Sequence, residues 1–106
     1  MSERNDSCLV AGGGIIAARA IASLLAAGIR VTVVSPWLAP ALLEVAREGG
    51  LAWWPREYTP GDVSAFARVV AATDDANVNA RVLTEARNLG LPVSPPGPPP
   101  VAADRR

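Results

Sequence analysis

A run of three glycines lies close to the start of the chain, where residues 12–17 read Gly-Gly-Gly-Ile-Ile-Ala. The run follows a short apolar segment and opens a stretch of helix-forming residues. In such a setting Gly12 permits a tight turn, Gly14 lets a phosphate approach the backbone, and Ala17 allows the helix to pack closely on the strand. The first N–H groups of the helix would face the anion. We therefore expect a site for a dinucleotide pyrophosphate; the alternative is a tight turn that packs well and binds nothing.

The end of the second predicted strand is where a nucleotide-binding domain commonly places an acid for the ribose hydroxyls. Here that place holds Ser35 and Pro36. Ser35 offers a hydrogen bond to a ribose but no charge. No arginine stands there to hold a 2′-phosphate, although Arg30 opens the strand. These residues alone leave the choice between NAD and NADP open.

A second polar segment, Thr73-Asp74-Asp75, ends the fourth predicted strand. In a doubly wound sheet this end borders the crevice beside the first strand, where ligands bind. One expectation is that Asp74 and Asp75 cap the following helix. The alternative is that Thr73 and Asp74 contact a cofactor or substrate.

Composition excludes several classes of chemistry. All ten basic residues are arginine, so neither Lys Schiff-base chemistry nor His acid–base catalysis is available. The formal net charge of zero argues against binding nucleic acid or a membrane surface. Cys8 is the single cysteine, which excludes an internal disulfide and a Cys-based metal site. We expect Cys8 to be a buried core residue rather than a reactive thiol, and we expect no metal.

Targeting signals are lacking in the sequence. The first residues are polar and have no apolar segment of the signal-peptide kind. Arg19 and Arg30 interrupt the best candidate for a membrane span. A cytoplasmic protein is the expectation.

The elements that must position these residues alternate along the chain. Apolar runs predict strands, helical spacing of apolar residues predicts helices, and the alternation predicts a Rossmann-like, doubly wound parallel α/β sheet of about five strands in the order 3-2-1-4-5. Trp53, Trp54 and Tyr58 are expected to pack in the core or at the sheet edge, with a flat ligand or a partner subunit as the alternative. The predicted strands are 8–11, 31–34, 51–54, 68–72 and 91–93, and the predicted helices are 15–27, 39–48, 63–66 and 76–89.

The domain is expected to span residues 1–94. Five of the six residues from 95 to 100 are proline, a composition typical of extended polyproline II. Residues 95–106 are therefore expected to be a poorly ordered tail.

Four segments, residues 10–19, 27–36, 54–62 and 71–82, together resemble the NAD-binding domain of the siroheme-synthase group. This group comprises precorrin-2 dehydrogenase, alone or fused with sirohydrochlorin ferrochelatase. The resemblance covers residues 8–93, and its most particular parts are Arg-Glu-Tyr-Thr-Pro at 56–60 and Ala-Ala-Thr-Asp-Asp at 71–75. Enzymes of the group use NAD to oxidise precorrin-2 to sirohydrochlorin, and some also insert iron. The cofactor contacts that the resemblance implies are Gly12, Gly13, Gly14, Ile15, Ile16, Ser35, Pro36, Trp37, Thr73 and Asp74.

Two departures from the group bear on catalysis. In the group the fifth strand leads into an Asn-x-x-Asp stretch whose Asp serves both activities, whereas residues 94–97 here read Ser-Pro-Pro-Gly. The group also continues into a dimerisation segment and a helical domain that complete the tetrapyrrole cleft, and this chain is expected to lack both.

Three functions follow as hypotheses. The first is a precorrin-2 dehydrogenase-like protein of siroheme biosynthesis with a tetrapyrrole substrate, weakly active or inactive alone. The second is a non-catalytic NAD(H)-binding or regulatory module that works with a partner chain. A homodimer or a separate partner chain is an expectation under both of these hypotheses. The third is a nucleotide-sensing domain of the potassium-channel regulatory type, against which the Ser35-Pro36 pair argues. The residues give no candidate for a catalytic group.

Overall fold

The sheet of this protein has five parallel strands in the order β3-β2-β1-β4-β5. The computed structural model describes residues 7–94. The predicted doubly wound fold and its strand order are thereby confirmed. The strands are β1 (Ser7–Ala11), β2 (Arg30–Val34), β3 (Ala52–Trp54), β4 (Arg68–Ala71) and β5 (Val93–Ser94).

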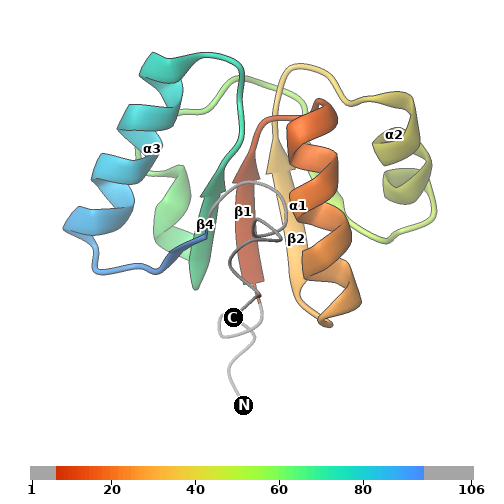
Figure 1. Ribbon diagram of the computed structural model, residues 1–106, viewed down its shortest axis with the longest axis horizontal. Helices are drawn as coiled ribbons and strands as arrows, with labels where there is room; N and C mark the ends of the chain where they lie inside the picture. The colour runs from red at the N-terminus through yellow and green to blue at the C-terminus, as the bar shows by residue number, and fades with distance from the viewer. Residues whose placement is uncertain (1–6, 95–106) are drawn as a thin grey trace, which may run out of the picture.

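Helices cover both faces of the sheet (Figure 1). They are α1 (Ile15–Ala26), α2 (Pro40–Arg47), the 3₁₀ helix η2 (Asp62–Ala65) and α3 (Ala76–Asn88). On one face α1 and α2 pack in a cluster that includes Cys8 and Val10 of β1. On the other face η2 and α3 pack in a cluster that includes Leu9 and Ala11. Because alternate residues of β1 enter different cores, its buried residues 8–11 are all apolar, as a central parallel strand requires.

Cys8 lies in the first of these cores with no exposed surface. Burial raises the pKa of its thiol to about 12, against a smaller lowering by Arg68. The expectation of a buried core cysteine is therefore confirmed.

The predicted elements differ from the observed ones mainly at their ends. The short helix after β3 begins one residue earlier than predicted and is a 3₁₀ helix. β5 begins at Val93 rather than at residue 91, because Pro92 has no N–H to donate and offers only its carbonyl, which accepts from the Val69 amide at 3.2 Å. The Pro-rich segment 95–106 lies outside the described residues. No helix within residues 7–94 is long and apolar enough to cross a membrane.

Candidate functional site

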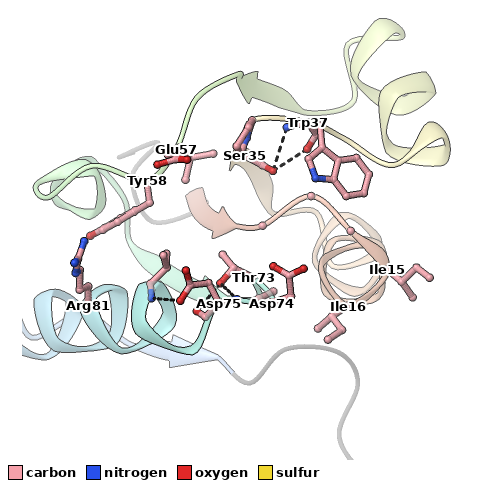
Figure 2. Close-up of a pocket in the computed structure, with 17 residues that line it drawn as sticks. Ile15, Ile16, Ser35, Trp37, Glu57, Tyr58, Thr73, Asp74, Asp75 and Arg81 are labelled. Carbon is pink, nitrogen blue, oxygen red and sulfur yellow. Dashed lines mark hydrogen bonds between the residues drawn. The ribbon is translucent and has the colours of Figure 1, made fainter.

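A cleft of about 590 Å³ opens at the carboxyl ends of β1, β2 and β4 (Figure 2). The structure brings all ten residues that were predicted to contact a cofactor to this one cleft, and their contacts with a cofactor stay a prediction. They come from the β1–α1 turn, the β2–α2 loop and the β4–α3 loop. All ten line the cleft: Gly12, Gly13, Gly14, Ile15, Ile16, Ser35, Pro36, Trp37, Thr73 and Asp74.

Gly12 and Gly13 are fixed by contacts within the protein. Gly12 has φ +124°, and a Cβ added there would lie 2.3 Å from the carbonyl oxygen of Ala72. A Cβ on Gly13 would lie 2.3 Å from the carbonyl oxygen of Trp37. The glycine turn is thus held between the β4–α3 loop on one side and the β2–α2 loop on the other. Sequence reasoning gave no task to Gly13, because the G-x-G-x-x-A pattern leaves its second position unspecified.

Gly14 differs from its two neighbours. A Cβ added there would have no heavy atom within 4 Å, and φ is −98°. No packing contact or backbone strain therefore calls for glycine at this position. Gly14 is the N-cap of α1, which has no side-chain cap and no acidic residue in its first turn. Its first N–H groups and its positive dipole end consequently face the cleft, as an anion site requires.

The two isoleucines after Gly14 stand at the rim of this site. Ile15 is 77% exposed and Ile16 is 51% exposed, whereas Ala17 is fully buried against the sheet. Any contact of residues 15 and 16 with an anion would therefore be made by their backbone, while Ala17 provides the close helix packing that was predicted.

Ser35 is buried and shapes the β2–α2 loop. Its Oγ donates to the Trp37 carbonyl at 2.7 Å and accepts from the Trp37 amide at 3.4 Å, and its carbonyl accepts from Trp53 Nε1 at 2.9 Å. The hydroxyl proton is thus committed inside the protein, and only a lone pair is left for a ribose. The neighbouring Trp37 side chain is 57% exposed at the cleft. Arg30 begins β2 at the end opposite Val34, which lines the cleft, so Arg30 is not placed to hold a 2′-phosphate.

The β4–α3 loop presents Thr73, Asp74 and Asp75 to the cleft. The Asp75 carboxylate accepts from the amides of Asn77 and Val78 at 2.9 and 3.4 Å and caps α3. Capping was therefore the right interpretation for Asp75 and the wrong one for Asp74. Asp74 is exposed and lies next to Thr73 at the cleft (Figure 2).

The far wall of the cleft is formed by the segment after β3 and by α3. Of its residues, only Tyr58 was named from the sequence as a candidate contact, with a flat ligand as the alternative to core packing. Glu57 and Tyr58 line it, together with Val78 and Arg81 of α3. The Tyr58 hydroxyl donates to the Glu85 carboxylate, which also accepts from the Gly61 amide at 3.0 Å. Burial and the Glu85 carboxylate both raise the pKa of Tyr58, so this phenol stays protonated. The signal for this wall was the position of residues 55–58, because the carboxyl ends of parallel strands share one edge of the sheet.

The Arg-Glu-Tyr-Thr-Pro segment owes its shape to an ion pair. Arg56 lies with its guanidinium 5.0 Å from the centre of the Trp54 ring and donates to Asp62 in a bidentate pair at 2.9 and 3.0 Å. Burial raises the pKa of Asp62, but the hydrogen bonds from Arg56 and from the Thr59 amide outweigh it and hold the pKa below its usual value. Trp54 in turn packs edge-to-face on Phe66, with ring centroids 5.7 Å apart.

The charged side chains that line the cleft are three acids, Glu57, Asp74 and Asp75, and one base, Arg81. Carboxylates repel an anionic group, so two places in the cleft favour one: the N-terminus of α1 and the Arg81 guanidinium on the far wall. Within residues 7–94 no three His, Cys, Asp or Glu side chains are grouped to hold a metal ion. The arrangement suits a ligand that has phosphates at one end and hydroxyl or amide donors nearby.

The sequence of this chain is similar to those of known proteins. A family model described as "Putative NAD(P)-binding" matches residues 1–99. Siroheme synthase of Chromobacterium violaceum is 43% identical over 91 residues, which are 86% of this chain and 19% of that protein. Siroheme synthase of Nitrosospira multiformis is 45% identical over 83% of this chain and 20% of that protein.

A solved structure shares the fold as well. The precorrin-2 dehydrogenase SirC superposes with a TM-score of 0.70 at 32% identity, over 78% of this chain and 42% of SirC. In contrast to its coverage of SirC, the chain spans only about a fifth of the length of the two siroheme synthases named above.

Proposed function

Because this chain belongs to the family of NAD(P)-binding domains that siroheme synthases and precorrin-2 dehydrogenase share, we propose that it binds NAD in the cleft at the glycine turn. The role proposed for it is precorrin-2 dehydrogenase-like, serving the oxidation of precorrin-2 to sirohydrochlorin in siroheme biosynthesis. Bound NAD would accept the hydride in such an oxidation. The residues of this chain would bind and orient it.

The observation that carries the proposal is the open surface over Gly14. No packing contact needs a glycine there, whereas a pyrophosphate on the α1 N-terminus does. The cleft volume of about 590 Å³ is in the range of small-molecule sites. Each part of the proposed site therefore has a task for this ligand: the α1 N-terminus for the phosphates, the loop with Trp37 for the adenosine, and the loop with Asp74 for a ribose.

The preference for NAD over NADP is part of the proposal. Among the described residues that line the cleft, Arg81 on α3 is the sole base, and the β2–α2 loop contributes none. A 2′-phosphate at that loop would have no counter-charge, whereas the hydroxyls of NAD need none.

Turnover is proposed to be weak or absent in this chain alone. Gly97 stands where the resemblance places the Asp that serves catalysis. The same observation supports a second candidate, a non-catalytic NAD(H)-binding or regulatory module that works as a homodimer or with a partner chain. The tetrapyrrole substrate belongs to the first candidate only.

Two measurements separate the candidates. Titration with NAD and NADH, followed by isothermal calorimetry and by the emission of Trp37, Trp53 and Trp54 together, is expected to show saturable binding at one site. Failure of both cofactors to bind contradicts both candidates. Incubation with precorrin-2 and NAD then tests turnover by absorbance. A rate above the spontaneous oxidation supports the dehydrogenase and contradicts a purely non-catalytic module. A rate equal to the spontaneous oxidation contradicts turnover by this chain alone and leaves the binding module standing.

A further inference from the structure

Asn79 lies outside the cleft lining but holds the loop that forms part of it. It sits one turn into α3 and is half-buried. Its Oδ1 accepts from the Thr73 amide at 3.1 Å and from the Thr73 hydroxyl at 2.7 Å, while its Nδ2 donates to the Thr73 carbonyl at 3.0 Å. A side chain must both accept and donate to make these contacts, as a carboxamide does.

These bonds leave Thr73 with no polar group to spare. Its amide and carbonyl are held by Asn79, and its hydroxyl also lies 2.9 Å from the Asp75 carbonyl and accepts from the Asp75 amide at 3.1 Å. The Asp75 carboxylate caps α3. Among the described residues of this loop, Asp74 therefore has the carboxylate that is open to a ligand, and it lies at the cleft (Figure 2).

The charge of Asp74 restricts what it can meet. A carboxylate accepts hydrogen bonds and repels phosphate, so it must face a donor of the ligand. Ribose hydroxyls are the donors that lie next to the pyrophosphate of a dinucleotide. The free energy that such a hydrogen bond contributes to binding depends on how firmly the carboxylate is held in place. A mobile loop would lose conformational entropy on binding, and that loss would weaken the affinity.

We propose that Asn79 is a positioning residue for the cofactor, which acts by fixing Thr73 and thereby holding the Asp74 carboxylate against a ribose hydroxyl. This inference rests on the proposed binding of a nicotinamide dinucleotide. Of the two cofactor contacts predicted in this loop, Thr73 and Asp74, it keeps the ligand contact for Asp74 alone and adds Asn79, a residue that does not touch the ligand.

The test is a double-mutant cycle with NADH as the probe, read by calorimetry. Asn79→Ala and Asp74→Ala are each expected to raise the Kd about tenfold, the loss of one charge-assisted hydrogen bond. The double variant is expected to bind as Asp74→Ala does, with the Asn79 substitution adding less than about twofold in that background. Asn77→Ala is the matched control, because Asn77 is an exposed asparagine in the same turn of α3.

Coupling distinguishes positioning from mere stabilisation of α3. A purely structural Asn79 would lower the Tm and leave the Kd unchanged, and independent effects would multiply in the double variant; either result overturns the inference. If Asn79→Ala does not fold, Thr73→Val keeps the shape of the side chain but removes its hydroxyl, and with it the side-chain contacts to Asn79 and to the Asp75 backbone. The same cycle with Asp74→Ala then applies. A wild-type chain that binds no NADH contradicts the proposed function itself, which is a different outcome from binding without coupling.

Discussion

Substitution of Gly14 by alanine is expected to separate ligand binding from folding. The new Cβ would have no heavy atom within 4 Å, and the backbone at φ −98° is open to alanine. Alanine is a poorer N-cap than glycine but restricts the unfolded chain, and the two effects oppose each other. The free energy of unfolding should therefore change by no more than about 1 kcal/mol.

Binding should respond far more strongly. The added methyl group occupies the surface over the α1 N-terminus, where the pyrophosphate is proposed to lie. Loss of a single charge-assisted hydrogen bond costs about 1.5–3 kcal/mol, which corresponds to a rise in Kd of roughly 10- to 150-fold.

Gly12→Ala is the matched contrast for this prediction. A residue other than glycine at φ +124° is strained, and its Cβ would lie 2.3 Å from the Ala72 carbonyl oxygen. Strain of about 1–2 kcal/mol and displacement of packed backbone at about 1–3 kcal/mol sum to roughly 2–5 kcal/mol. The Tm should fall by about 10 °C or more.

The assay pairs thermal unfolding with calorimetric titration of NAD and NADH for the wild type, Gly14→Ala and Gly12→Ala. The expected pattern is loss of affinity with a near-normal Tm for Gly14→Ala and a large loss of Tm for Gly12→Ala. Wild-type affinity in Gly14→Ala would refute the placement of the pyrophosphate at this turn.

Three further outcomes follow from single groups. Burial raises the pKa of the Cys8 thiol to about 12 in the folded chain, so as the pH rises this thiol ionises first in the unfolded chain. Its contribution to the free energy of unfolding is complete below pH ~8.5 and should fall by on the order of 2 kcal/mol by pH ~10. Urea titrations of Cys8→Ala should lack this loss, and a dependence of stability on alkaline pH equal to that of the wild type would contradict the prediction. The pKa of Asp62 is lowered, with Arg56 and the Thr59 amide outweighing burial, so Asp62→Asn should cost about 1 kcal/mol at neutral pH after allowance for solvent screening. Urea unfolding should show that the stability difference between the wild type and Asp62→Asn vanishes as the pH falls through the lowered pKa of Asp62, below ~4. A stability difference that persists below that pH would contradict the ion-pair explanation. Trp37→Phe should abolish most of the emission change on NADH binding while the calorimetric heat remains, and a full emission change would place the ligand away from Trp37.

Much of the fold was predictable because its signals are local. The apolar runs of β1 and β2 and the glycine pattern between them each depend on neighbouring residues. The alternation of elements predicts a parallel sheet, for which 3-2-1-4-5 is a common doubly wound order. The cleft was predictable for the same reason, since the strand ends that carry Gly12, Ser35 and Thr73 must meet at one edge of a parallel sheet.

The remainder depends on contacts between residues distant in sequence or on the paths of loops. The close approach of Trp37 to Gly13, the bond of Tyr58 to Glu85 and the hold of Asn79 on Thr73 have no local signature. Element ends were displaced for a related reason, because strand pairing depends on which backbone groups find partners. Pro92 shows this by delaying the start of β5.

The most direct test of the dinucleotide site is a titration of the ¹⁵N-labelled chain with NADH, followed by amide chemical shifts. The site predicts that the largest saturable shifts fall on Gly14, Ile15 and Ile16 at the N-terminus of α1, with smaller ones on Trp37 and Asp74. Shifts confined to other surfaces, or no shifts at millimolar NADH, would contradict it.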